Sequence, residues 1–187
     1  ALLSGSNSEI LTKERLLLNM IQRMSGVSSL TGKYVEKLNN NKIKVLDTRK
    51  TTPGLRMFEK YAVFCGGGSN HRLNLSSGIM VKDNHINKIT DEVADKLTRI
   101  SPSLPIQFEV DSPKQINSQN VSLVDAFLLD NMTPNKIKKC IEKINLLKNK
   151  DKKIFIEVSG GVTLKNISKF NLKGVNGISV GALTHQS

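Results

Sequence analysis

Short apolar runs alternate with stretches of helical periodicity along most of this 187-residue chain, and this alternation restricts the fold more than any other feature. Each run suits a strand that is buried on both faces of a parallel sheet. The expected strands are IKVLD (43–47), GIMVKD (78–83), PIQFEV (105–110), AFLLD (126–130), IFIEVSGG (154–161) and GISVGA (177–182), with NHRLNL (70–75) as a further candidate. The expected helices between them cover residues 55–64, 86–100, 113–119, 134–147 and 164–170. Repeated strand–helix alternation predicts a parallel α/β fold.

The N-terminal region precedes the first expected strand and has helical periodicity of its own. Residues 9–39 predict helix in one or two pieces, with a break near Ser25 and Gly26. No low-complexity linker divides the chain. We therefore expect one domain over residues 1–187, in which residues 1–40 form leading helices.

Polar or glycine-rich residues follow nearly every expected strand at its C-terminal end, whereas the N-terminal ends carry nothing comparable. These residues are Asp47-Thr48-Arg49-Lys50, Lys82-Asp83-Asn84-His85, Glu109, Asp130-Asn131, Ser159-Gly160-Gly161 and Gly181-Ala182. The C-terminal ends of all strands meet at one mouth in an α/β barrel, whereas an open sheet concentrates its chemistry at a switch point. The pattern predicts a parallel α/β barrel of six or seven strands, complete or incomplete.

The formal net charge of +12 indicates an anionic partner, and nucleic acid is the first class to consider. Many lysines, however, lie within KIKKCIEKINLLKNKDKK (136–153), where apolar residues recur at helical spacing. These lysines are expected on the solvated face of a helix. The sequence has no zinc-finger spacing and no aromatic-rich binding strand, so a basic nucleic-acid-binding protein remains only the alternative function.

Cations and carboxylates are both expected at the mouth of the barrel. The cations at or beside strand ends are Arg49, Lys50, His71, Arg72 and Lys82. Guanidinium groups bind carboxylates in bidentate fashion, so this set suits an anionic substrate. The acids of the later strands are Glu109, Asp130 and Glu157, and a structural salt bridge is the alternative for each. The histidines include no close ligand pair such as HxxxH, so no histidine metal site is expected.

Two glycine-containing loops follow late strands, where barrels frequently bind phosphate. SGGVTLKN (159–166) places Ser-Gly-Gly between a strand and an expected helix, and GALT (181–184) follows the next strand. Glycines let backbone N–H groups approach a phosphate, and a helix N-terminus favours negative charge. A plain turn is the alternative for either loop alone. Together the cations, acids and glycine loops predict a phosphorylated substrate beside a carboxylated one.

Neither a membrane span nor a secretory leader is expected. No apolar run approaches the roughly 20 residues that a membrane-spanning helix needs. Glu9 and Lys13 interrupt the N-terminal region, which therefore lacks the layout of a signal peptide. Cys65 and Cys140 are far apart and form no CxxC motif, which favours reduced thiols in a cytoplasmic protein.

Several long blocks, in this order, resemble the barrel domain of quinolinate phosphoribosyltransferase, also called nicotinate-nucleotide pyrophosphorylase (carboxylating). The blocks are KERLLLNMIQRMSGVSSLTGKYV (13–35), DTRKTTPGLRMFEKYAVFCGGGSNHRLNL (47–75), GIMVKDNHI (78–86), FLLDNM (127–132), EVSGGVTL (157–164) and ISVGALTHQS (178–187). The resemblance spans nearly all of the chain. It implies an enzyme of NAD biosynthesis that converts quinolinate and phosphoribosyl pyrophosphate, with Mg²⁺, into nicotinate mononucleotide, pyrophosphate and carbon dioxide.

The resemblance also implies a role for each predicted site residue. The expected quinolinate pocket contains Thr48, Arg49, Lys50, His71 and Arg72. The residues expected to face the ribose, the pyrophosphate and magnesium, as the catalytic set, are Lys82, Glu109 and Asp130, of which Glu109 and Asp130 are the candidate metal ligands. The residues expected to hold the 5′-phosphate are Ser159, Gly160, Gly161, Val180, Gly181 and Ala182. Arg15 is expected to reach the neighbouring subunit's site in a homodimer or higher homo-oligomer.

The sequence departs from the family pattern in two ways. Gln107 stands where the family usually has the first of two glutamates in that strand. The chain also lacks the family's N-terminal α/β sandwich domain and its C-terminal tail. We therefore expect a fragment or a truncated product, and an inactive truncated barrel is a second alternative to the enzyme.

Overall fold

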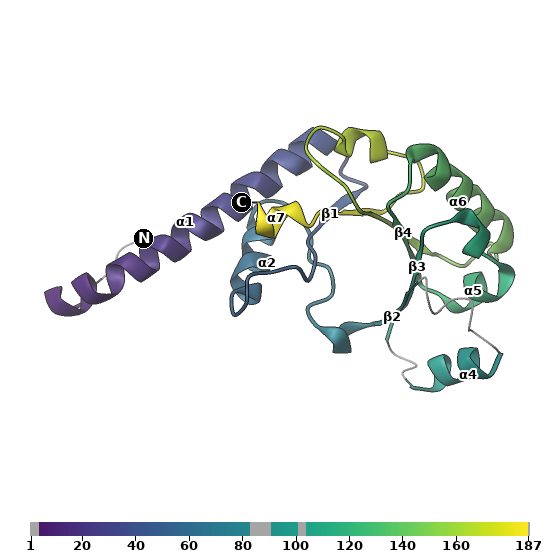
Figure 1. Ribbon diagram of the computed structural model, residues 1–187, viewed down its shortest axis with the longest axis horizontal. Coiled ribbons are helices and arrows are strands. Elements are labelled where there is room, and N and C mark those ends of the chain that lie inside the picture. Colours follow the sequence, from purple (N-terminus) through teal and green to yellow (C-terminus); the bar gives the residue numbers. More distant parts are fainter. Residues whose placement is uncertain (1–3, 83–90, 101–103, 187) are drawn as a thin grey trace.

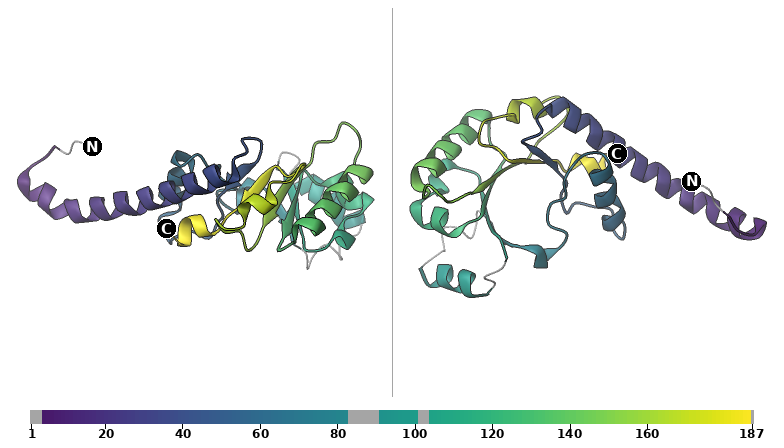
Figure 2. Two further views of the ribbon diagram at one scale, coloured as in Figure 1. Left: turned by 90° about the horizontal axis from the view of Figure 1, so that it is seen from above. Right: turned by 180° about the vertical axis from the view of Figure 1, so that it is seen from behind.

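The computed structural model of the chain describes residues 4–82, 91–100 and 104–186 (Figure 1). It begins with α1 (Asn7–Leu38), which is capped at its start by Ser6 and ends at Asn39 in the left-handed conformation. The N-terminal half of α1 contains no buried residue. This half projects well beyond the rest of the molecule, as two perpendicular views agree (Figure 2, left).

Helix α1 is continuous, so the break expected near Ser25 and Gly26 is wrong. Its buried side chains recur along one stripe of the C-terminal half: Val27, Thr31, Tyr34 and Leu38. An interior glycine costs only about 1 kcal/mol relative to alanine, and burial of this stripe outweighs that cost. The helix therefore continues through Gly26 and packs against α2 (Arg56–Cys65).

The described residues contain one parallel sheet of six strands, in the spatial order β1-β6-β5-β4-β3-β2. The strands are β1 (Lys44–Leu46), β2 (Ile79–Val81), β3 (Ile106–Val110), β4 (Ala126–Asp130), β5 (Phe155–Ser159) and β6 (Gly177–Ser179). The sheet curves round a central space, with helices on its outer face (Figure 2, right). This architecture is the parallel α/β barrel that strand-end chemistry predicted, in an incomplete form.

No seventh strand closes the barrel within the described part of the chain. Ser69 forms an isolated parallel bridge with Leu46, but residues 70–75, expected as a strand, leave the sheet toward the 3-10 helix η1 (Leu75–Ser77). The side chains of Asp47 and Lys60 bind the backbone of His71, which therefore does not pair with a neighbouring strand. The backbone N–H of His71 donates to Asp47 Oδ1 at 2.7 Å, and the Lys60 ammonium donates to the His71 carbonyl at 3.1 Å.

The remaining helices and turns follow the strands: α4 (Asp91–Ile100), η2 (Pro113–Gln115), α5 (Ser118–Leu123), α6 (Pro134–Leu147), η3 (Ile167–Phe170) and α7 (Ala182–His185). The single helix expected over 113–119 is wrong, because Ser112 and Asn117 each form a capping box that starts a separate element. The helix expected over 164–170 is a 3-10 turn that begins at Ile167. Part of the helix expected over 86–100, and residues 83–85, lie outside the described residues.

Apolar side chains fill the space between the sheet and the outer helices. Phe108 and Phe127 are fully buried on neighbouring strands and meet edge to face, with ring centroids 6.4 Å apart. Helix α6 buries Ile137, Cys140, Ile141 and Ile144. Its lysines Lys136, Lys138 and Lys139 are exposed, as the helical spacing predicted. Among the helices of the described residues, none is both long enough and apolar enough to cross a membrane.

Candidate active site

The C-terminal ends of the strands surround a cavity of about 680 Å³. All site residues predicted from the sequence line it except Arg15 and Val180. They are Thr48, Arg49, Lys50, His71, Arg72, Lys82, Glu109, Asp130, Ser159, Gly160, Gly161, Gly181 and Ala182. Parallel pairing brings these distant segments together, because every strand points its C-terminal end toward the same mouth.

Two arginines form the cationic centre of the cavity. Arg49 follows β1, and its Nη1 atom is buried and has no hydrogen-bond partner among the residues that the structure describes. The Arg72 guanidinium donates to the Gly78 carbonyl and to the Met80 sulfur, each at the long distance of 3.3 Å. Burial lowers the pKa of Arg72, and the neighbouring charge of Arg49 lowers it further. A partly buried cationic pair of this kind binds an anion favourably, because the anion supplies strong, charged acceptors.

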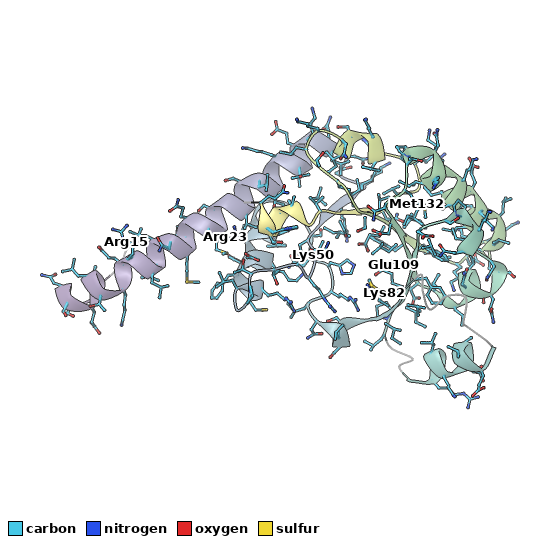
Figure 3. The ribbon with its side chains drawn as sticks, viewed as in Figure 1. Arg15, Arg23, Lys50, Lys82, Glu109 and Met132 are labelled. Atoms are coloured by element: carbon cyan, nitrogen blue, oxygen red, sulfur yellow. The ribbon has the colours of Figure 1, made fainter. Side chains whose placement is uncertain are left out.

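Lysines and carboxylates complete the wall of the cavity. Figure 3 shows Lys50, Lys82 and Glu109 around the same central space, and all three line the cavity. Asp130, at the end of β4, accepts a hydrogen bond from the Asn131 side-chain amide at 2.8 Å. No cluster of three or more potential metal-ligating side chains occurs in the described ranges.

The loop after β5 has a backbone conformation that requires glycine. Gly160 and Gly161 both have positive φ, at 88° and 62°. A Cβ atom at Gly160 would lie 2.2 Å from the side-chain oxygen of Asn131, so only glycine fits. The Asn166 amide donates to the Gly161 carbonyl at 2.9 Å and holds the loop in place. The helix expected to begin directly after this loop is wrong, so no helix dipole contributes.

Two predicted residues lie outside the cavity. Val180 is buried, and its backbone N–H donates to the Leu46 carbonyl at 2.9 Å, so this amide is already engaged. Arg15 is exposed on the projecting half of α1, far from the mouth (Figure 3). Within this chain, therefore, neither side chain contributes to the pocket.

His71 is held at all four of its polar atoms. Its backbone N–H and carbonyl contact Asp47 and Lys60, as described above. Its Nδ1 atom accepts the backbone N–H of Arg72 at 2.8 Å, and its Nε2 atom lies 3.1 Å from Glu157 Oε2. His71 lines the cavity, as the sequence predicted, and these four contacts hold its ring in a fixed position.

Several lining or supporting residues were not assigned to the site from the sequence. Glu157 was recognised only as a strand carboxylate, although a charged residue inside the apolar run IFIEVS is a signal of an interior role. Lys60 was missed altogether, because it lies within a plain helical pattern. In the structure Lys60 and Asp47 form a buried ion pair at 2.5 Å. Burial raises the pKa of Asp47 despite the opposing effects of Lys60 and of the His71 N–H.

Comparison with known proteins identifies the family to which this architecture belongs. The family model described as "Quinolinate phosphoribosyl transferase, C-terminal domain" matches residues 27–187. The chain belongs to the quinolinate phosphoribosyl transferase family. The match includes the strand ends that line the cavity and the C-terminal half of α1.

Individual members of the quinolinate phosphoribosyl transferase family are similar over nearly the whole chain. A probable nicotinate-nucleotide pyrophosphorylase [carboxylating] of Bacillus subtilis is 40% identical over 98% of the chain, and the corresponding Mycobacterium leprae protein is 37% identical over 94%. The crystal structure of NadC from Streptococcus pyogenes superposes with a TM-score of 0.86 at 41% identity over 97% of the chain. The chain spans 62% of the length of each of these two relatives and 63% of the Streptococcus chain.

Proposed function

We propose that this chain provides the catalytic barrel of a carboxylating nicotinate-nucleotide pyrophosphorylase. In this reaction the phosphoribosyl group of phosphoribosyl pyrophosphate is transferred to quinolinate, and nicotinate mononucleotide, pyrophosphate and carbon dioxide are formed. The observation that carries the proposal is the buried Arg49 Nη1 atom. It has no hydrogen-bond partner within the described part of the chain and lies near Arg72, in a cavity that carboxylates and glycine loops also line. The names of the related proteins support the same chemistry.

The cationic half of the cavity would bind quinolinate. Arg49 and Arg72 offer guanidinium groups for the two carboxylates, with Lys50 and Thr48 beside them. The polar atoms of His71 are engaged by protein groups, so its contribution to the pocket is shape and position. Fixed cations of this kind would orient the pyridine nitrogen toward the sugar carbon that it attacks.

The opposite half of the cavity would bind phosphoribosyl pyrophosphate. The 5′-phosphate fits the glycine loops, whose members are Ser159, Gly160, Gly161, Gly181 and Ala182. Lys82 would face the pyrophosphate as a counter-charge. Glu109 and Asp130 would face the ribose, where positive charge develops as the bond to pyrophosphate breaks.

The donor set fits magnesium that arrives with the substrate. Mg²⁺ prefers oxygen ligands and commonly binds through substrate phosphates plus one or two carboxylates. Glu109 and Asp130 are the carboxylates that would hold it, in agreement with the absence of a larger ligand cluster in the described residues. When bound, the ion would neutralise charge on the leaving pyrophosphate.

The charged side chains of the cavity would then favour each bond that forms or breaks during the transfer. The pyridine nitrogen forms a bond to the anomeric carbon as the carbon–oxygen bond to pyrophosphate breaks, and the pyrophosphate keeps that electron pair. The ring nitrogen becomes cationic, so the adjacent carboxylate can leave as carbon dioxide with its bonding electrons left on the ring carbon, which then takes a proton. Fixed cations and carboxylates lower the barrier because they are already oriented toward the charges that develop.

The assembly that we propose is a homodimer or higher homo-oligomer in which Arg15 completes the partner's site. The projecting half of α1 carries several exposed apolar side chains: Leu11, Leu16, Leu18 and Ile21. An apolar helix surface without a partner in its own chain is a typical interface. We place the reaction in the cytoplasm, where the free thiols of Cys65 and Cys140 would stay reduced.

The direct test is an assay of nicotinate mononucleotide formation by the purified chain with both substrates and Mg²⁺. We expect product, and we expect Arg72→Ala to abolish most of it. The exposed Lys138 of α6 gives a matched control, because Lys138→Ala also removes one cation but lies away from the cavity. If quinolinate binds in calorimetry but no product forms, the chain is the inactive barrel; if quinolinate does not bind at all, the proposed function is wrong.

A further inference from the structure

Glu157 occupies the interior of the barrel between two cavities. It lies in β5 and lines both the mouth cavity and a second cavity of about 360 Å³ on the other side of the same residues. Its side chain is only 2% exposed. A carboxylate so deeply buried is costly unless its oxygens are hydrogen-bonded.

Three side chains bind the Glu157 carboxylate. Oε2 lies 3.1 Å from His71 Nε2 and accepts a hydrogen bond from Gln107 Nε2 at 2.6 Å, and Oε1 accepts from the Ser179 hydroxyl. Burial alone would raise the pKa of Glu157, but these hydrogen bonds, led by that of His71, outweigh burial and lower it. Glu157 is therefore an ionised acceptor inside the barrel.

The contacts of His71 determine which ring nitrogen carries the proton. Nδ1 accepts the N–H of Arg72, so Nδ1 has no proton of its own. The neutral ring must then carry its proton on Nε2, which donates to Glu157 Oε2. The hydrogen bonds at Nδ1 and Nε2 depend on each other, because a flip of the ring or a change of tautomer would break both.

This arrangement connects Glu157 to the anion pocket through Arg72. His71 Nδ1 holds the backbone N–H of Arg72, from which the Arg72 side chain extends toward Arg49. The two arginine charges repel each other, and the repulsion would favour a conformation in which Arg72 swings away. A fixed backbone at Arg72 opposes that movement before any anion binds.

We infer that Glu157 is a positioning residue: it fixes His71 in the Nε2–H tautomer and, through His71 Nδ1, keeps Arg72 beside Arg49 for a dicarboxylate ligand. The identity of that ligand as quinolinate rests on the proposed function. The role of Glu157 depends on the position of its acceptor oxygen, and its negative charge is secondary.

Three substitutions separate position from charge. Glu157→Gln removes the charge but can place its carbonyl oxygen toward His71 and Gln107 and its amide toward the Ser179 oxygen. Glu157→Asp keeps the charge but is shorter by one methylene, about 1.5 Å, which lengthens the bond to His71 beyond hydrogen-bonding range. Glu157→Leu removes both charge and acceptor, and Glu142→Leu on the exposed face of α6 is the matched control.

The first readout is nitrogen NMR of histidine-labelled protein, in which His71→Phe identifies the His71 signals. We expect an unprotonated Nδ1 and a protonated Nε2 in the wild type, in Glu157→Gln and in Glu142→Leu, and loss of this single tautomer in Glu157→Asp and Glu157→Leu. The second readout is the calorimetric affinity for quinolinate. It should change less than threefold in Glu157→Gln and weaken at least tenfold in the Asp and Leu variants.

A double-variant comparison tests whether the effect passes through His71. In a His71→Phe background, Glu157→Leu should weaken quinolinate binding by less than a further twofold, because the connection is already broken. The inference is overturned if Glu157→Asp binds like the wild type while Glu157→Gln does not, or if wild-type Nδ1 is protonated. Failure of the wild type to bind quinolinate would contradict the proposed function, whereas the tautomer comparison would still decide the role of Glu157. Thermal unfolding of each variant shows whether a weaker affinity results from loss of the fold.

Discussion

Arg23 of α1 contacts Glu59 of α2 at 2.8 Å, and this pair joins three segments that meet at the mouth of the barrel. Glu59 is fully buried and also accepts the backbone N–H and the hydroxyl of Thr52, at 3.0 and 2.7 Å. Arg23 also donates to the Thr184 carbonyl of α7. The Thr184 hydroxyl in turn donates to the Lys50 carbonyl at 2.6 Å. The projecting helix is thereby connected to the loop that carries Arg49 and Lys50.

Replacement of Arg23 by methionine should destabilise the fold strongly. Arg23→Met leaves the buried Glu59 carboxylate without its counter-charge; because the Arg23 side chain is itself partly exposed, the cost should lie above that of a surface pair and below the about 3 to 5 kcal/mol of a fully buried pair. Chemical denaturation measures the change in the free energy of unfolding. Arg99→Met is the matched control, because Arg99 pairs with Asp95 on the exposed surface of α4 and such pairs contribute about 0.3 to 0.5 kcal/mol. Equal effects of the two substitutions would contradict this account.

The stability of the fold should fall in mild acid. Burial raises the pKa values of Glu59 and Glu157, but their hydrogen bonds and neighbouring charges outweigh burial and lower both below the usual 4.5. A lowered carboxyl pKa adds stability that is fully present above 4.5 and is lost as pH falls through the folded-state value. Unfolding free energies measured at a series of pH values below about 5 should therefore decline. Glu157→Gln should make that decline shallower, and an unchanged slope would rule out its contribution.

Quinolinate should bind far more tightly than nicotinate. The pocket presents two neighbouring, partly buried arginines, Arg49 and Arg72, and a ligand with one carboxylate leaves one of them without a charged acceptor. Isothermal calorimetry with the two acids measures the difference. Arg72→Ala should weaken quinolinate binding by more than tenfold and affect nicotinate less. Equal affinities for the two acids in the wild type would reject this explanation of the pocket.

Gly160 should tolerate no side chain, whereas its neighbour should tolerate one at moderate cost. Gly161→Ala introduces a residue at positive φ, where nothing lies within 4 Å of the new Cβ, so its cost is backbone strain of about 1 to 2 kcal/mol. Gly160→Ala adds an overlap with Asn131 to the same strain and should cost clearly more. Thermal unfolding of both variants provides the comparison. The explanation fails if the two melting temperatures fall by the same amount.

Mixing of two inactive variants tests the proposed shared site. Arg15→Ala removes the residue proposed to act in the partner's site, and Arg72→Ala removes a residue of the chain's own cavity. If subunits exchange, one site of each mixed dimer regains both residues, so nicotinate mononucleotide formation should partly recover. An active wild type and a measured exchange rate are the controls. With both in place, no recovery on mixing would show that Arg15 does not act in trans.

The strand-end residues show how much of the site could be read from the sequence. Parallel strands in one sheet place their C-terminal ends together, so a polar residue that follows an apolar run is predictably at the mouth. This rule located Arg49, Asp130 and the glycine pair after β5 without any knowledge of distances. The helical spacing of apolar residues also predicted a helix over residues 134–147, which agrees with the observed bounds of α6.

The same rules could not predict which residues, distant in the sequence, form hydrogen bonds or ion pairs with each other. Arg23 and Glu59 are 36 positions apart, and His71 and Glu157 are 86 apart. Neither pair has a spacing that periodicity could reveal. The sequence left residues 70–75 as a candidate strand for the same reason, because the backbone of His71 binds Asp47 and Lys60, whose side chains come from other elements.

The sequence by itself determined the order of strands and helices, the side of the barrel that carries the chemistry, and the kinds of groups gathered there. These follow from residue spacing and from the geometry common to all parallel sheets. Only the tertiary structure decided which of those groups are free to meet a ligand. Among the described residues, Arg49 Nη1 has no hydrogen-bond partner, whereas every polar atom of His71 is hydrogen-bonded. Each outcome depends on side chains that the fold brings together from distant parts of the chain.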